Sequence, residues 1–198
     1  MYINDVLNAY YSHKPLKMRR MLSELIYLSA RENNLSAEMI MAVILTESSF
    51  KDDAVSNKGA MGLMQLLPST AASIAEDLKI QWRGDRTLYD SQHNIRLGVY
   101  YLRKMMEVFD DMNTALTAYN AGPGYVINQT QQGKPYSDVY AKKVNENYRM
   151  LRKVYFNNWY NNWRGFYFYG GLQARRFSFL ILPRALYILS SFPSLEND

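Results

Sequence analysis

The stretch "ILTESSFKDDAVSNKGAMGLMQLLPSTA", residues 44–71, starts as a helix and then breaks into a loop that holds two glycines. Gly59 and Gly62 give this loop a backbone freedom that other residues lack. Pro68 suits the first turn of a helix, so the next helix is predicted to begin there. From residue 17 to residue 152, apolar and polar residues do not alternate as they do in a β-strand. A short β-hairpin near Gly59 is left open as an alternative. The fold class predicted from these patterns is mainly α.

Apolar residues at helical spacing predict further helices on both sides of this stretch. Ser36 is a favourable N-cap for the helix that contains residue 44. The segment "GDRTLYD", residues 84–90, is predicted to be a connector, and "GPG", residues 122–124, to be a loop. The predicted helices are "MRRMLSELIYLSARENN" (18–34), "LSAEMIMAVILTESSF" (35–50), "PSTAASIAEDLK" (68–79), "SQHNIRLGVYYLRKMMEVFD" (91–110), "MNTALTAYNA" (112–121) and "SDVYAKKVNENYRMLRKVY" (137–155).

The composition limits the chemistry that this chain can perform. The 198 residues include no cysteine, which excludes disulfides, zinc-thiolate sites and a cysteine nucleophile. The two histidines disfavour a metal site built from protein ligands and a histidine relay, so no cofactor or metal is expected. The net charge of +5 suits an anionic polymer partner, but the basic residues are spread along the chain, so nucleic-acid binding is not expected.

The chain is predicted to comprise an N-terminal extension (1–16), one helical domain (17–155) and a tail (156–198). The tail holds 12 of the chain's 28 aromatic residues without clear periodicity. A loosely attached tail without a catalytic role is favoured, and a segment that binds an envelope or secretion-machinery partner is the alternative. The N-terminus lacks the pattern of a signal peptide, and the apolar stretch 177–192 is too short and interrupted to be a transmembrane helix.

A carboxylate on an apolar stripe is the main indication of function. Ile40, Val43, Ile44 and Glu47 follow i, i+3, i+4, i+7 spacing, so Glu47 is predicted to lie on the core-facing side of its helix. Burial disfavours the charged form, and its pKa should therefore rise, which suits a general acid. The alternative is a glutamate at a helix end that pairs with Lys or Arg or reaches solvent.

Polar and aromatic residues downstream add to this indication. Hydroxyls of Ser48, Ser49 and Ser56 and the amide of Gln65 can hydrogen-bond sugars. In "AYNAGPG", Tyr119 and Asn120 end a helix beside a turn; a core tyrosine and a helix C-cap are the alternatives.

Four ordered blocks of this sequence resemble lytic transglycosylases of the soluble-lytic-transglycosylase type. The blocks are "ESSF" (47–50), "SNKGAMGLMQLLPSTA" (56–71), "NIRLGVYYL" (94–102) and "ALTAYNAGPG" (115–124). The resemblance implies a lysozyme-like helical domain that cleaves peptidoglycan.

Residue by residue, the resemblance implies that Glu47 is the single catalytic acid. It implies that Ser56 helps to position the substrate or the acid, that Gln65 lines the cleft, and that Leu67 lies near the sugar. Tyr119 and Asn120 match the family's Tyr-Asn pair, with the tyrosine hydroxyl close to the acid. The residues that the resemblance places in a supporting role are Ser48, Ser49, Gly62, Met64 and Tyr140.

The sequence departs from the family pattern in two places. The family often has a Glu-Thr-x-x-Tyr-Val block, where this chain has "YSDVYAKKV"; Tyr140 and Val144 fit its end, and Asp138 stands near the glutamate at a shorter spacing. Residues beyond 155 match nothing in the family.

The implied reaction is cleavage of the bond from N-acetylmuramic acid to N-acetylglucosamine, with 1,6-anhydro product ends. Two rival functions are a muramidase that hydrolyses the same bond, as goose-type lysozymes do, and a wall-binding or assembly protein without turnover. The expected partner is the peptidoglycan glycan strand, and a monomer is expected. The substrate implies the periplasm or cell envelope, with a phage- or secretion-system-borne protein as the alternative.

Overall fold

The computed structural model describes residues 2–153 of a chain that divides into two units, Met1–Tyr155 and Phe156–Asp198. The described part is helical, and no strand forms within it, which confirms the predicted fold class. The short β-hairpin that the sequence left open near Gly59 is reduced to isolated bridges, Val55 with Met61 and Met61 with Leu66. The aromatic tail lies outside the described residues.

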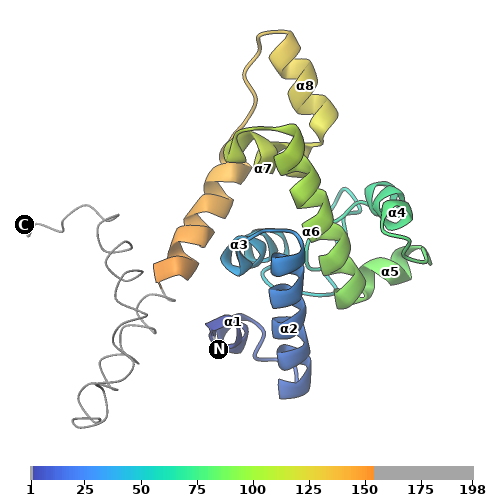
Figure 1. Cartoon of the computed structure of the whole chain (residues 1–198), viewed down its shortest axis with the longest axis vertical. Coiled ribbons are helices and arrows are strands. Elements are labelled where there is room, and N and C mark those ends of the chain that lie inside the picture. Colours follow the sequence, from blue (N-terminus) through green and yellow to red (C-terminus); the bar gives the residue numbers. More distant parts are fainter. Residues whose placement is uncertain (1, 154–198) are drawn as a thin grey trace, which may run out of the picture. The chain divides into compact units, whose positions relative to one another are not determined.

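Most of the helices follow one another with short connections, and the main exception is the loop 49–67 (Figure 1). Another helix begins at residue 139 and continues to residue 153, the last that the structure describes. The labelled helices are α1 (Tyr2–Tyr10), α2 (Leu16–Glu32), α3 (Ala37–Ser48), α4 (Pro68–Asp77), α5 (Asp85–Tyr89), α6 (Ser91–Val108), α7 (Met112–Ala121) and α8 (Pro123–Gln131).

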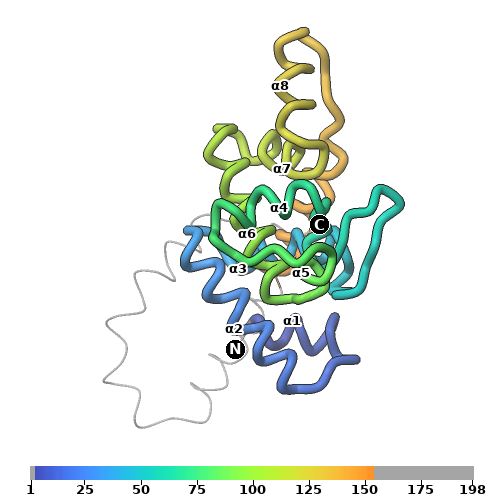
Figure 2. Tube along the Cα trace, turned by 90° about the vertical axis from the view of Figure 1, so that its right-hand side faces the viewer, coloured from blue at the N-terminus to red at the C-terminus, as the bar shows by residue number. Residues whose placement is uncertain are grey.

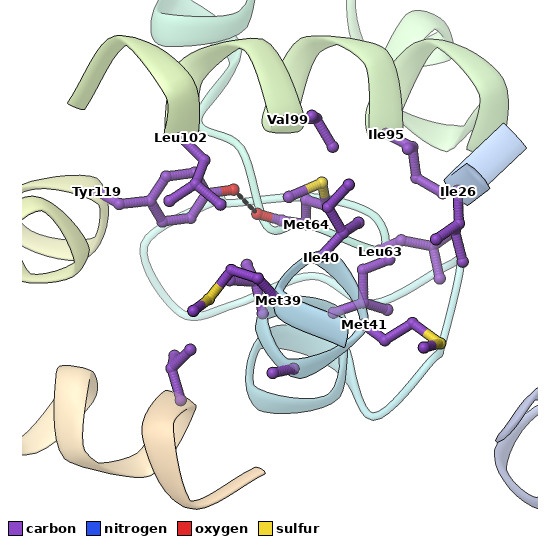
Figure 3. Close-up of a cluster of buried hydrophobic side chains, with 14 of the residues drawn as sticks. Ile26, Met39, Ile40, Met41, Leu63, Met64, Ile95, Val99, Leu102 and Tyr119 are labelled. Atoms are coloured by element: carbon purple, nitrogen blue, oxygen red, sulfur yellow. Dashed lines mark hydrogen bonds between the residues drawn. The ribbon is translucent and has the colours of Figure 1, made fainter. Parts of the chain in front are cut away.

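The core is built around α3. Ser36 caps this helix as predicted, and its hydroxyl accepts a hydrogen bond from the Met39 amide at 3.2 Å. Six consecutive residues, 39–44, are at most 6% exposed, so α3 is buried on every side and not along one stripe. Figure 3 shows the residues that surround it, which come from α2, α6, α7 and the loop before α4: Ile26, Leu63, Met64, Ile95, Val99, Leu102 and Tyr119.

The long helix α6 packs against α2, α4, α5 and α7. Asp90 starts it by accepting a hydrogen bond from the His93 amide at 2.9 Å. Ile95, Val99 and Leu102, which share one side of the helix, are fully buried. Met106 and Phe109, farther along the chain, are only partly buried.

Two connections differ from the sequence prediction. The connector 84–90 contains the short helix α5. The "GPG" segment is not a loop, because α8 begins at Pro123, one residue after Gly122 turns the chain at a φ of 88°. Proline at the first helical position explains this immediate restart. Helix α8 extends away from α3 in both views (Figures 1 and 2).

The segment 2–11 joins the same core as α3. Val6, Leu7 and Tyr11 are at most 3% exposed, and α1 packs against α2. This segment lies within the predicted N-terminal extension, whose boundary at residue 16 stays a prediction. Among the described helices, none combines the length and apolar character that a membrane crossing requires.

Candidate active site

Glu47 lies in the last turn of α3, where the helix stops abruptly. Ser49 and Phe50 both take left-handed φ angles, 51° and 61°, which end the helix. Phe50 is fully buried and stacks on Tyr10 at 5.9 Å between ring centroids. Ser48 is buried as well, and its hydroxyl donates to the Leu63 carbonyl at 2.9 Å. These contacts hold the end of α3 firmly, so the position of Glu47 is fixed by its neighbours.

The carboxyl of Glu47 is half-buried and directly hydrogen-bonded. The Tyr140 hydroxyl donates to Glu47 Oε1 at 2.6 Å. Burial raises the pKa of Glu47 from 4.5 to about 7, although the Tyr140 hydrogen bond and the charge of Lys143 both act to lower this pKa. Burial therefore outweighs two groups that favour the carboxylate, and the carboxyl holds its proton near neutral pH.

The helix at 139–153 supplies Tyr140 and Lys143, the two groups that act to lower the pKa of Glu47. It faces the end of α3, because Tyr140 bonds Glu47 and the Asn147 amide donates to Thr46 Oγ1 at 2.9 Å. Lys143 lies between these positions on the same helical face. Lys143 was not predicted as a site residue, although its i+3 spacing from Tyr140 could have indicated it.

Tyr119 lies beside this pair but does not bond the acid. Its ring stacks on Tyr140 with centroids 6.5 Å apart and an interplanar angle of 19°. Its buried hydroxyl donates to the Met64 carbonyl at 2.8 Å. The tyrosine hydroxyl expected at the acid from the Tyr-Asn pair is thus not that of Tyr119, and Tyr140 bonds Glu47 directly. Burial, and then the charge of Glu47, raise the pKa of Tyr119 well above its usual value.

The loop 54–66 is held by hydrogen bonds that use several predicted site residues. The Ser56 hydroxyl accepts from the Ala60 amide at 3.0 Å and so closes a turn. The Gln65 amide donates to the carbonyls of Ala54 at 3.0 Å and Gly62 at 2.9 Å. Ser56 as an acceptor and Gln65 as a donor thus shape the loop, and within residues 2–153 neither side chain hydrogen-bonds Glu47.

Asn94, at the start of the "NIRLGVYYL" block, anchors the same loop to α6. It is fully buried, accepts from the Met64 amide at 2.8 Å, and donates to the carbonyls of Met61 and Leu88 at 3.0 Å each. Gly62, with a φ of 78°, has no room for a side chain, since a Cβ would collide with Asn94. Asn94 stands in a block that resembles the family, but the sequence indicated no role for it. Its hydrogen bonds to the loop are what a buried polar side chain is expected to form.

The remaining predicted residues are exposed at the surface. Leu67 is 41% exposed and immediately precedes α4. Asn120 is exposed near the end of α7, but the C-cap of that helix is Gly122, so the C-cap alternative for Asn120 is wrong. Ser49 is exposed too. Asp138 forms an ion pair with Lys142 at 3.0 Å and is not among the groups that shift Glu47.

The described residues include no cluster of three His, Cys, Asp or Glu side chains that could hold a metal ion. The chemistry that the site offers is that of one carboxyl with a raised pKa, which accepts a hydrogen bond from a phenol and is acted on by the charge of Lys143.

A family model described as the transglycosylase SLT domain matches residues 24–140. The chain is 36% identical to the transglycosylase of Enterobacteria phage PRD1 over 128 residues, which are 65% of this chain and 43% of the phage protein. It is 31% identical to membrane-bound lytic murein transglycosylase C of Haemophilus influenzae over 147 residues, 69% of this chain and 40% of that protein.

A similar solved structure is that of lytic transglycosylase Slt from Pseudomonas aeruginosa, an inactive mutant with glutamine in place of a glutamate. The TM-score is 0.52 at 30% identity, with 66% of this chain and 22% of that chain covered. The chain thus spans less than half the length of each of these three proteins.

Proposed function

The chain belongs to the transglycosylase SLT domain family, and we propose that it is a peptidoglycan lytic transglycosylase with Glu47 as its one catalytic acid. The observation that carries this proposal is the half-buried Glu47 carboxyl, whose pKa is raised to about 7 and whose Oε1 accepts a hydrogen bond from Tyr140 at 2.6 Å. A general acid is most effective when its pKa lies near the working pH. Relatives whose names state that they act on murein support the choice of substrate.

The surroundings of Glu47 support a mechanism with a single carboxyl. Most glycosidases use two carboxyl groups, about 5 to 10 Å apart. Within residues 2–153, the groups that shift the pKa of Glu47 besides burial are Tyr140 and Lys143, and neither is a carboxylate. Asp138, the candidate second acid, is engaged with Lys142.

In the proposed first step, Glu47 donates its proton to the glycosidic oxygen between N-acetylmuramic acid and N-acetylglucosamine. The bond from C1 to this oxygen breaks, and the N-acetylglucosamine leaves with a 4-hydroxyl group. The acetamido oxygen of the muramoyl residue stabilises the positive charge at C1. In the second step, the Glu47 carboxylate takes the proton of the muramoyl 6-hydroxyl while O6 bonds to C1. The 1,6-anhydro ring closes, Glu47 regains its proton, and no water is consumed.

Tyr140 and Lys143 have a defined part in this sequence. Both favour the ionised form of Glu47, which the first step produces and the second step consumes. Their interactions with Glu47 therefore become stronger once the proton has left, and interactions of that kind lower the barrier. Tyr140 also fixes the orientation of the carboxyl group towards the substrate.

The hydrolytic muramidase is the nearest rival, since it would use the same acid with water as the acceptor. Mass spectrometry of the products from purified peptidoglycan separates the two functions. We expect muropeptides that end in 1,6-anhydro-N-acetylmuramic acid from the wild type, and none from Glu47→Gln. Glu38→Gln, at the opposite end of α3, is the matched control and should retain the activity. No product from a folded wild type would favour the wall-binding alternative.

The location and partners follow from the substrate. We infer that the protein works at the bacterial envelope on glycan strands; the similarity to both a membrane-bound and a phage enzyme is consistent with more than one route there. A monomeric state and an envelope or secretion-machinery partner for residues 156–198 stay predictions.

A further inference from the structure

We propose that Lys143 binds a carboxylate of the muramoyl side chain and so makes the site prefer an anionic glycan over a neutral one. This inference rests on the proposed function and adds a specificity-determining residue to it. Lys143 lies beyond the residues matched by the family model, which end at residue 140.

The position of Lys143 follows from its two neighbours on the helix at 139–153. Tyr140 reaches Glu47 at 2.6 Å, and Asn147 reaches Thr46 at 2.9 Å, so this helical face is turned towards the end of α3. Positions 140, 143 and 147 share one face of a helix. The charge of Lys143 accordingly acts on the Glu47 carboxyl.

The ammonium group of Lys143 is available for a ligand. Its side chain is exposed, and no ion pair joins it to any carboxylate in the part of the chain that the structure describes. The adjacent Lys142 differs in this respect, because it pairs with Asp138 at 3.0 Å. The acid on which Lys143 acts is Glu47, which is neutral while it holds its proton. When protonated Glu47 meets the substrate, it therefore does not neutralise the charge of Lys143.

The chemistry of the substrate fits this cation. N-acetylmuramic acid differs from N-acetylglucosamine by a lactyl ether on O3, which ends in a carboxyl group. This carboxyl is either free or joined to a stem peptide that carries carboxylates of its own. A muramoyl C1 held at Glu47 places O3 on the same sugar ring, and a lysine side chain is long and flexible enough to meet an anion there. A neutral N-acetylglucosamine polymer offers no such group.

The test measures binding in a Glu47→Gln background, where turnover is absent and residue 47 is neutral. Isothermal titration calorimetry at low ionic strength compares three soluble glycans. One is free of peptide and has free lactyl carboxylates, one is the same glycan with these groups converted to N-methylamides, and one carries stem peptides. We expect Lys143→Gln to weaken binding of the free-carboxylate glycan about fivefold, the upper range for an exposed ion pair. Binding of the amidated glycan should not change.

Two variants serve as controls. Lys142→Gln removes a neighbouring charge from the same helix and should leave all three affinities unchanged. Lys143→Arg keeps the charge and should retain the binding of the anionic glycans. A loss confined to the peptide-bearing glycan would assign the carboxylate to the stem peptide, and a loss with the peptide-free glycan assigns it to the lactyl group.

Equal affinities in Lys143→Gln and its parent for every glycan would overturn the proposal, as would an equal loss for the amidated glycan. Turnover by the chain with Glu47 intact is measured separately. Carboxylate-dependent binding without turnover would refute the proposed reaction alone, and turnover without any effect of Lys143 would refute this inference alone. Absence of binding to all three glycans would overturn both.

Discussion

Replacing Glu47 by Gln should stabilise the protein, and the gain should depend on pH. In the wild type the folded protein keeps Glu47 in a half-buried place that disfavours its charge, because burial raises the pKa from 4.5 to about 7. Glutamine is neutral at every pH, and its side-chain oxygen can still accept the hydrogen bond from Tyr140. The substitution therefore removes the burial cost of the charge while leaving the shape of the site nearly unchanged.

The size of the effect follows from this pKa. A rise from 4.5 to about 7 corresponds to about 3 kcal/mol, at about 1.4 kcal/mol for each pKa unit. The unfolded chain loses the proton near pH 4.5 and the folded chain only near pH 7. The free energy of unfolding of the wild type should therefore fall by about 3 kcal/mol between these values through this residue and stay level above them. Glu47→Gln should not show this fall in the free energy of unfolding, because glutamine does not titrate.

Urea unfolding followed by circular dichroism at several pH values from 4 to 9 measures this difference. The free energy of unfolding of Glu47→Gln minus that of the wild type should grow by about 3 kcal/mol from pH 4 to pH 8. Equal unfolding slopes for the two proteins would show that the same surface is exposed in both. A difference that is constant over this range, or that shrinks as the pH rises, would refute the electrostatic account of Glu47.

Further substitutions test other parts of the structure. Tyr140→Phe removes a donor that lowers the pKa of Glu47, so the alkaline limb of the plot of kcat against pH should move to higher pH; a move to lower pH would contradict this role. Asn94→Ala removes three hydrogen bonds to the backbone, those to the Met64 amide and to the Met61 and Leu88 carbonyls, and should lower the free energy of unfolding by about 3 kcal/mol in urea titrations. Gly98→Ala should cost about 1 to 3 kcal/mol by the same assay, because a Cβ there would lie 2.7 Å from Met64 Cβ. Ser36→Ala removes the cap of α3 and should cost about 1 kcal/mol, whereas Ser36→Asn should cost little.

The order of helices was largely predictable, because caps and prolines act locally. Ser36 and Pro68 begin helices where the sequence places them. Helices α5 and α8 were missed because glycine and proline at their starts indicated a connector and a loop. At Pro123 the same signal marks the start of a helix, since proline lacks only an amide hydrogen that the first turn does not use.

The sequence pattern singled out Glu47 for a reason that holds only in part. The pattern assumed one apolar stripe, but Met41 and Ala42 are as buried as Ile40, so α3 has no polar face along most of its length. Helical spacing alone therefore does not distinguish Glu47 from other residues of this helix. The raised pKa arises at its last turn, where the helix at 139–153 closes over the carboxyl.

The partner of the acid was not predictable from spacing. Tyr119 and Tyr140 are both tyrosines on helices that pack beside α3, and their rings stack on each other. Which hydroxyl reaches Glu47 depends on tertiary packing between segments 93 residues apart, whereas the Tyr119 hydroxyl finds the Met64 carbonyl. The effect of the Lys143 charge on Glu47 depends on the same tertiary packing.

The most direct test of the central claim is cleavage of purified peptidoglycan in water enriched in oxygen-18, followed by mass spectrometry of the new muramoyl ends. If Glu47 acts alone and the 6-hydroxyl is the acceptor, the new ends carry the 1,6-anhydro mass and no oxygen-18. One oxygen-18 atom at each new end would mean that water is the acceptor, and would contradict the proposed transglycosylase reaction.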